Sequence, residues 1–301
     1  MRRFFGWLFK PFRRRAKQQD TDPSIAGVET ADEDAFDEPA SPWPESRLRL
    51  LQRLWGEGFV RSGEFEYLRE FLPLLGLTEK NSLLLIGAGL GGAGQMIVDE
   101  TSAWVTGYEN QKELADLGKL RAKMTGMTKR APVNFCDFAA LKLRAKSFDT
   151  CVSIESLYTT PDKKSALTSI AESLRGTGEL WYTDFVLPNH EPPNDVVQAW
   201  SEALPHAVHL WPGTVTQTLL KTLDLDVQPP DDITKAYRGR IFKSLLTFLA
   251  STNKAELREI VDGVFQELEF LGKLINALDS GGLKVYRFHA YKKRDTRPSA
   301  I

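Results

Sequence analysis

The sequence contains little of what marks redox, metal-binding or membrane-spanning proteins. Only two of its 301 residues are cysteines, Cys136 and Cys151, and they form no CxxC pair. Two thiols cannot complete a zinc site without nearby histidines, so both are expected to be buried, reduced thiols of a cytoplasmic protein. No apolar run approaches the ~20 residues that a membrane-spanning helix needs.

The chain also has almost no net charge. Its formal charge of −1 at pH 7 provides no overall field that would attract nucleic acid. Hydrophobic residues make up 42% of the chain and charged residues 26%, as in an ordinary soluble globular protein. We therefore expect no nucleic-acid partner.

The small net charge hides an asymmetry at the start of the chain. Residues 1–17 hold seven arginines or lysines and no acid. On a helical wheel their large apolar residues share one arc and the cations lie opposite, which is typical of a helix lying in the interface of an anionic membrane. The alternative is a disordered basic tail. The apolar arc consists of Phe4, Phe5, Leu8, Phe9 and Phe12.

Residues 18–45 reverse the sign of the charge. Their sequence, QQDTDPSIAGVETADEDAFDEPASPWPE, is acidic, contains prolines and has few large apolar residues. Such a composition cannot bury a core, so we expect a disordered acidic linker. Residues 46–301 then show the periodicity of a globular domain.

In residues 46–301, apolar strands alternate with amphipathic helices. This order predicts an α/β fold, namely a Rossmann-like, doubly wound sheet of seven strands with helices on both faces. A mostly helical insertion, about residues 189–282, precedes the last strand. The strands are expected within 83–86, 103–109, 132–138, 148–157, 178–186, 223–228 and 281–293.

The first predicted strand runs directly into a glycine-rich turn, in the stretch SLLLIGAGLGGAG of residues 82–94. Ligands of doubly wound sheets bind at the carboxyl ends of the strands, so the turn predicts a nucleotide site. Sites for ATP, NAD, FAD and S-adenosylmethionine all use such turns. The spacing of Gly87, Gly89 and Gly92 also fits the dinucleotide pattern, so spacing alone does not exclude NAD.

Acids at two neighbouring strand ends narrow the choice of nucleotide. Glu109 ends the second strand 18 residues after Gly91, where its carboxylate can accept hydrogen bonds from both hydroxyls of a ribose. Asp137 closes the third strand, where it can reach an adenine amino group, and Phe138 can cover the adenine ring. These positions favour an adenosine-containing ligand other than NAD.

At these residues the chain resembles the class I S-adenosylmethionine-dependent methyltransferases. The segment WGEGFVRSGEFEYLREFLPLLGL is also similar to the one that precedes the glycine turn in phosphoethanolamine and related small-molecule methyltransferases, and the resemblance spans about residues 48–293. It implies S-adenosylmethionine as the cofactor. The residues it assigns to the cofactor are Gly87, Ala88, Gly89 and Gly91 in the turn, Glu109 and Asn110 at the ribose, Asp137 and Phe138 at the adenine, and Val60 and Arg61 in a lid.

The chain departs from the family pattern at three places. Leu85 stands where the family usually has an acid that helps to hold the cofactor's amino group, a charge-assisted contact of about 1.5–3 kcal/mol. Thr159 stands where phosphoethanolamine methyltransferases have a histidine, and RGTGE replaces a proline-glycine-glycine turn before the fifth strand. These departures argue against phosphoethanolamine as the substrate.

Three residues that follow strand ends are the candidate catalytic groups: Glu155, Tyr158 and His190. Methyl transfer requires an aligned nucleophile and, for some acceptors, removal of a proton. His190 is the best general base by position, and an exposed loop histidine is the alternative. His206 and His209 are three residues apart but lack further ligands, so no metal site is expected.

These observations predict a methyltransferase that uses S-adenosylmethionine and acts on a small or lipid-like acceptor. We expect it in the cytoplasm, held through residues 1–17 as a peripheral protein on the inner face of a membrane. The alternative, which the absent acid and histidine favour, is a catalytically inactive binding or scaffold protein with the same fold.

Overall fold

A computed structural model describes residues 41–293 of the chain, apart from the side chains of 254–262. The basic segment 1–17 and most of the acidic linker 18–45 lie outside the described residues. The first described helix, α1, begins at Glu45. The described residues 41–293 belong to one compact unit.

A single mixed sheet runs through the domain, in the order β3-β2-β1-β4-β5-β9-β7. The strands β1 to β5 pair in parallel, whereas β9 is antiparallel to both of its neighbours. Two short strands lie outside this order, since β6 pairs with β5 and β8 with β9. The strands are β1(Ser82–Ile86), β2(Trp104–Glu109), β3(Val133–Phe135), β4(Phe148–Ile154), β5(Leu174–Leu187), β6(Trp211–Pro212), β7(Leu225–Val227), β8(Asp231–Asp232) and β9(Lys284–Lys292).

Helices cover both faces of this sheet. The strand β1 shows this in its sequence, because Leu83 and Leu85 pack into one hydrophobic cluster and Leu84 and Ile86 into the other. A strand buried on both faces reads as a continuous apolar run instead of an alternating one. The α-helices are α1(Glu45–Trp55), α2(Glu64–Phe71), α3(Gly92–Thr101), α4(Lys112–Met124), α5(Lys163–Ser173), α6(Asp195–Glu202), α7(Gly213–Thr222), α8(Thr234–Ser251) and α9(Lys254–Asp279).

The predicted architecture is confirmed, with additions in the insertion. The expected doubly wound α/β sheet and its seven main strands are present, and the insertion is mostly helical. The insertion also contains β6 and β8, which the sequence analysis missed. Each has only two residues, too short for a run of apolar or β-branched residues to mark it.

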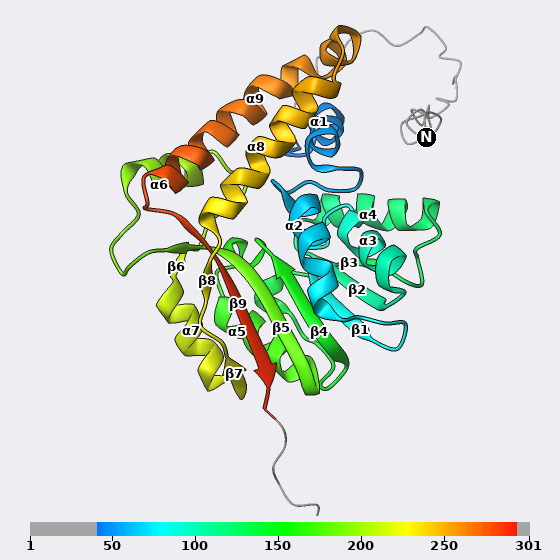
Figure 1. Cartoon of the computed structure of the whole chain (residues 1–301), viewed down its shortest axis with the longest axis vertical. Coiled ribbons are helices and arrows are strands. Elements are labelled where there is room, and N and C mark those ends of the chain that lie inside the picture. Colours follow the sequence, from blue (N-terminus) through cyan, green and yellow to red (C-terminus); the bar gives the residue numbers. More distant parts are fainter. Residues whose placement is uncertain (1–40, 294–301) are drawn as a thin grey trace, which may run out of the picture. The chain divides into compact units, whose positions relative to one another are not determined.

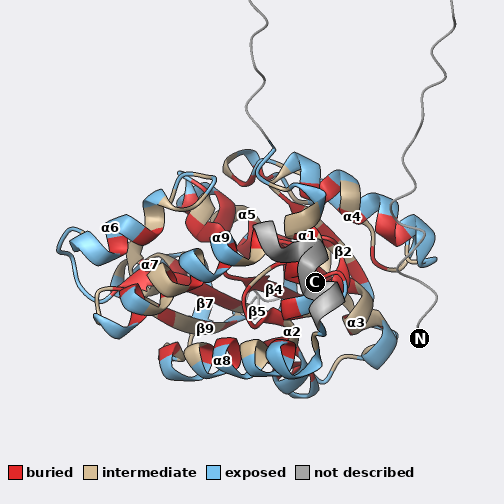
Figure 2. Cartoon of the chain, turned by 90° about the horizontal axis from the view of Figure 1, so that it is seen from above, coloured by how far each residue is buried: buried red, intermediate tan, exposed pale blue. Residues whose placement is uncertain are grey.

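Helices α8 and α9 pass back and forth beyond the carboxyl ends of the parallel strands (Figure 1). The helix α9 packs against α1 and α6, so segments from both ends of the described chain meet above the sheet. Seen from above, buried residues follow the strands and the inward sides of these helices (Figure 2). The insertion therefore roofs the edge of the sheet at which ligands of this fold bind.

Among the described helices, none is both long and apolar enough to cross a membrane.

Candidate functional site

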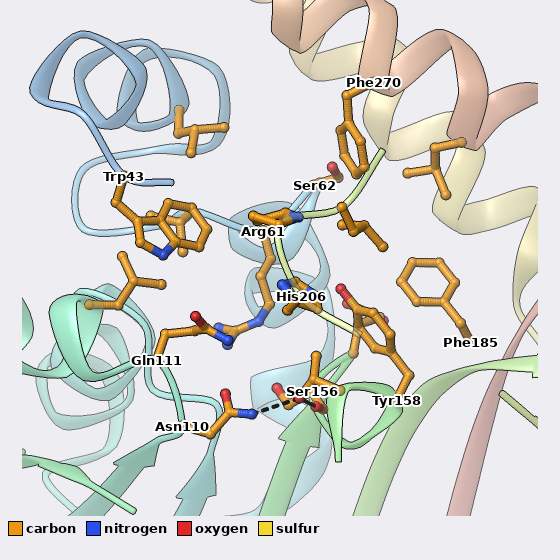
Figure 3. Close-up of a pocket in the computed structure, with 18 of the residues that line it drawn as sticks. Trp43, Arg61, Ser62, Asn110, Gln111, Ser156, Tyr158, Phe185, His206 and Phe270 are labelled. Carbon is orange, nitrogen blue, oxygen red and sulfur yellow. Dashed lines mark hydrogen bonds between the residues drawn. The ribbon is translucent and has the colours of Figure 1, made fainter. Parts of the chain in front are cut away.

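A cavity of about 90 Å³ lies at the carboxyl ends of β1, β2 and β4, beneath the helical roof. The strand ends supply its floor, the segment between α1 and α2 one wall, and the insertion the cover (Figure 3). Polar residues gather on the side of the glycine turn and aromatic residues on the side of the insertion. The residues that line it include Arg61, Glu109, Asn110, Glu155, Tyr158, Phe185, Trp200, His206 and Tyr237.

Three glycines of the turn have a left-handed backbone conformation, which glycine adopts readily. Gly87, Gly89 and Gly91 have φ angles of 82°, 53° and 86°, which L side chains rarely adopt. A Cβ atom at Gly87 would lie 1.8 Å from the Ser156 hydroxyl oxygen. Ala88, the other turn residue that the family resemblance assigns to the cofactor, is buried. The backbone N–H groups of Gly87 and Ala88 donate to the Tyr108 carbonyl oxygen, at 2.8 and 2.9 Å, which ties the turn to the end of β2.

Glu109 ends β2 with no exposed surface. Its Oε2 accepts from the Gly89 N–H at 2.8 Å and from Arg61 Nη2 at 3.0 Å, and its Oε1 accepts from the Gln111 N–H at 3.0 Å. The neighbouring Asn110 donates from Nδ2 to the Thr159 hydroxyl oxygen at 2.7 Å. The carboxylate is thus directed into the site by backbone donors, and one of its oxygens also holds the guanidinium of Arg61.

The segment 56–63, which joins α1 to α2 and contains the residues expected in a lid, lies over the glycine turn. The Gly58 carbonyl oxygen accepts from the Gly92 N–H at 3.0 Å, at the start of α3. Val60 Cγ2 would lie 3.3 Å from a Cβ atom at Gly89. Arg61 Nη1 donates to the Gly87 carbonyl oxygen at 2.5 Å, so the lid is closed over the turn.

Two buried acids lie in or near the cavity: Glu155 lines it, and Glu64 Oε1 lies 3.9 Å from Arg61 Nη1. Loss of hydration raises the pKa of Glu155 to about 7 and that of Glu64 to about 7. Glu155 directly follows β4 and has a φ of 36°, an unusual backbone conformation for a residue other than glycine. A carboxyl group with such a pKa is partly protonated near neutral pH and can therefore give or accept a proton.

Aromatic side chains form the far wall of the cavity. The Tyr158 ring meets the Phe185 ring edge-on, with centroids 5.1 Å apart, and Phe185 in turn meets Trp200 at 5.0 Å and Tyr237 at 5.7 Å. Phe185 belongs to β5 of the sheet, whereas Trp200 and Tyr237 belong to α6 and α8 of the insertion. Their arrangement gives this half of the cavity an apolar, rigid surface.

A buried ion pair lies beside this wall. Lys163 Nζ donates to Asp184 Oδ2 at 2.7 Å, and both side chains are fully buried. The Tyr182 hydroxyl also donates to Asp184, whose Oδ1 accepts from the Tyr158 N–H at 3.1 Å. The carboxylate therefore fixes the turn that carries Tyr158.

His206 is a site residue that the sequence analysis missed. It lines the cavity from the loop after α6, 5.7 Å from the Tyr158 ring, and neither ring nitrogen has a hydrogen-bond partner. Burial, together with the charge of Arg61, lowers the pKa of His206 to about 4. The ring is therefore neutral at pH 7. Its spacing to His209 suggested only a metal pair, and no signal in the sequence placed it above the strand ends.

The structure does not bring three predicted residues to the cavity. His190 is exposed and lies 3.4 Å from the Thr214 hydroxyl, so the imidazole in the site is His206 instead. Asp137 is exposed and accepts from the Ala139 N–H at 2.9 Å, which caps a short 3₁₀ turn. Phe138 is fully buried in the hydrophobic cluster around Leu84. Among the described residues, no group of histidines, cysteines or acids could hold a metal ion.

Comparison with known proteins agrees with this geometry. A family described as "Methyltransferase domain" matches residues 84–182. Phosphoethanolamine N-methyltransferase 1 of Arabidopsis thaliana is 22% identical over 143 residues, which cover 48% of this chain and 29% of that protein. This chain has the class I methyltransferase fold.

Solved structures resemble this chain over more of its length. A putative sarcosine dimethylglycine methyltransferase from Galdieria sulphuraria superposes with a TM-score of 0.64 at 17% identity, covering 82% of this chain and 97% of that one. Phosphoethanolamine N-methyltransferase 2 of Haemonchus contortus, solved with phosphomonomethylethanolamine and S-adenosylhomocysteine, gives 0.63 at 18% identity, covering 82% of this chain and 57% of that one. At these identities the likeness establishes the fold. The chain spans about a third of the length of the curated phosphoethanolamine methyltransferases that it matches.

Proposed function

We propose that this protein is an S-adenosylmethionine-dependent methyltransferase acting on a small or lipid-like acceptor. The observation that carries the proposal is the buried carboxylate of Glu109 beside a glycine turn, at the edge of a class I methyltransferase sheet. The alternative of an inactive scaffold receives no support from the related proteins, which are named as methyltransferases.

The chemical character of the residues at the site suits S-adenosylmethionine. Gly87 and Gly89 have no side chain on the side where the Arg61 guanidinium now lies, Glu109 supplies an acceptor for ribose hydroxyls, and Asn110 lies next to it. The cavity of about 90 Å³ is too small for the cofactor as it stands, because pockets for ligands of this size have volumes of about 300–1,000 Å³. Side chains that line the cavity therefore have to move before the cofactor can bind. Arg61 occupies part of the site in this conformation, so we expect its side chain to move when the cofactor binds.

When bound, the cofactor supplies an electrophilic methyl group, and the protein has to align a nucleophile with it and exclude water. The aromatic wall of Tyr158, Phe185 and Trp200 would hold the apolar part of the acceptor. The roof made by α6, α8 and α9 would exclude solvent. Glu155 and neutral His206 would take a proton from an acceptor whose nucleophile is protonated.

Membrane association is the second part of the proposal, and its basis is the sequence of residues 1–17. Each Arg or Lys near an anionic surface contributes about 1 kcal/mol, so seven cations beside an apolar arc would hold the protein reversibly. In this proposal the enzyme would work in the cytoplasm at the inner face of a membrane, close to a lipid-like acceptor.

Calorimetric titration with S-adenosylmethionine tests the proposal. The wild-type chain should bind it in the micromolar range, and Glu109→Ala should weaken binding at least tenfold, because the ribose hydroxyls lose a charged acceptor, a loss of about 1.4 kcal/mol or more. Glu100→Ala, at the exposed end of α3, is the matched control and should bind like wild type. No binding by the folded wild-type chain would overturn the proposal, and equal affinity of Glu109→Ala would overturn the role of Glu109.

A further inference from the structure

The Arg61 guanidinium spans both halves of the cofactor site. Its Nη1 is 2.5 Å from the Gly87 carbonyl oxygen, at the glycine turn, and its Nη2 is 3.0 Å from Glu109 Oε2, at the end of β2. The side chain is 18% exposed. These contacts take up the carboxylate oxygen that faces the site, so a ribose hydroxyl would compete with Arg61 for Glu109.

The lid is fastened in this closed position by contacts of its own backbone. The Gly92 N–H donates to the Gly58 carbonyl oxygen at 3.0 Å, and the Gly58 N–H donates to Gln52 Oε1 at 2.9 Å. Gly58 has a φ of 81°, and a Cβ atom there would lie 2.8 Å from Gly92 Cα. The backbone around residue 58 is held by hydrogen bonds and close packing. Rotation of the Arg61 side chain out of the site therefore breaks fewer contacts than movement of the whole lid.

A displaced guanidinium needs a new anionic partner, because a buried charge without one is strongly unfavourable. Glu64 Oε1 is the nearest further carboxylate oxygen on the lid side, 3.9 Å from Nη1. Burial raises the pKa of Glu64 to about 7, so this partner is only partly ionised at neutral pH. On the turn side, Leu85 is apolar and buried and offers no charge. The carboxylate in the amino-acid part of S-adenosylmethionine would be such a partner, and arginine binds carboxylates in a two-pronged geometry.

We propose that Arg61 is a latch that selects ligands carrying a carboxylate. In the conformation described here it closes the site by bonding to Glu109 and Gly87. When the adenosine part of a ligand takes over Glu109, Arg61 turns from that acid to the ligand's carboxylate. This inference rests on the proposed function, and it makes Arg61 a specificity-determining residue of the cofactor site.

Two ligands that differ in the amino-acid part separate the steps of the latch. S-adenosylhomocysteine carries the carboxylate, whereas 5′-methylthioadenosine has the same nucleoside and thioether without it. Calorimetry with the full chain should show that Arg61→Ala binds 5′-methylthioadenosine at least fivefold more tightly than wild type, since nothing then competes for Glu109. Its affinity for S-adenosylhomocysteine should not rise, because the lost contact to the ligand's carboxylate offsets that gain, so the preference for S-adenosylhomocysteine should fall at least fivefold.

Two variants control this experiment. Arg61→Gln keeps most of the side-chain length without the charge and should lower the preference in the same direction, which covers the case that Arg61→Ala does not fold. Arg69→Ala removes an exposed arginine from α2 and should keep the wild-type preference. An unchanged preference in folded Arg61 variants that bind both ligands would overturn the latch alone. Failure of wild type and variants to bind either ligand would overturn the proposed function together with it.

Discussion

Burial sets the charge of single residues around the cavity. Glu155 is 5% exposed, and its pKa of about 7, compared with an ordinary value of 4.5, reflects the cost of ionising a carboxyl group away from water. His206 shows the opposite change, because burial disfavours its protonated form. The site therefore contains an acid and an imidazole that are both partly or wholly neutral at pH 7.

Replacement of Glu155 should change how stability depends on pH. In the wild-type chain, the neutral carboxyl stabilises the fold fully below pH 4.5, and this contribution is lost as the pH rises through about 7. At about 1.4 kcal/mol per pKa unit the loss reaches about 3 kcal/mol. Urea unfolding of Glu155→Gln should thus show a gain over wild type at pH 8.5 that is absent at pH 4. Glu100→Gln should show no such pH-dependent gain, and a constant difference between Glu155→Gln and wild type from pH 4 to 8.5 would contradict the assignment.

His206 should titrate apart from the other histidines. The chain has four histidines, and the pKa of His206 is lowered to about 4 from an ordinary 6.5. NMR titration of the ring protons should show one signal that stays neutral down to about pH 4, and His206→Asn should remove it. His209→Asn is the matched control and should leave that signal in place. If the signal lost in His206→Asn moves near pH 6.5, the ring is exposed to water and does not face a closed cavity.

At the scale of helices and strands, the spacing of apolar residues predicted the seven main strands of the sheet. The run Leu83–Ile86 is apolar throughout because both faces of β1 are covered, and the glycines after it have the backbone conformation that a close approach requires. The predicted ends of the second and fourth strands correctly located Glu109 and Glu155 at the same edge of the sheet, where both line the cavity. Local sequence could not place His206, because the path of the loop after α6 depends on how the insertion packs on α1 and β5. For the same reason, His190 follows a strand end and yet turns away from the cavity.

The ion pair between α5 and β5 should be essential to the stability of the domain. Removal of Lys163 leaves the buried Asp184 charge without its cation, which costs about 3–5 kcal/mol. Thermal or urea unfolding of Lys163→Met should show this loss, whereas Lys164→Met, on the exposed side of the same helix, should stay within about 0.5 kcal/mol of wild type. The double variant Lys163→Met with Asp184→Leu should recover part of the stability, because it removes the isolated charge. Equal stability of the two lysine variants would show that Asp184 does not depend on Lys163.

At the scale of the whole molecule, the charge of the chain is divided between its start and its folded part. Residues 1–17 are strongly basic, residues 18–45 are acidic, and the domain follows from about Ser41. A flexible linker made of residues 18–40 would span on the order of 25 Å, so a basic segment bound to a membrane would leave the domain free to turn. The proposed enzyme would then work near a surface without inserting its domain.

Vesicle sedimentation tests this arrangement. The full chain should sediment with anionic vesicles at low salt and less at high salt, because salt screens the attraction of exposed charges. A chain that starts at Ser41 should stay in solution. A full chain with Phe4→Ser and Phe9→Ser keeps all seven cations but loses part of the apolar arc, and should bind more weakly than wild type. Equal binding by the full and the shortened chain would show that residues 1–17 are not the anchor.

A crystal structure of the full chain with S-adenosylhomocysteine tests the central claim most directly. The account predicts that the ligand lies between the glycine turn and β2, with its ribose hydroxyls bonded to Glu109 and the Arg61 guanidinium moved away from that carboxylate. A ligand bound elsewhere, or no ligand in crystals grown with a large excess of it, would contradict the assignment of this cavity as a methyltransferase site.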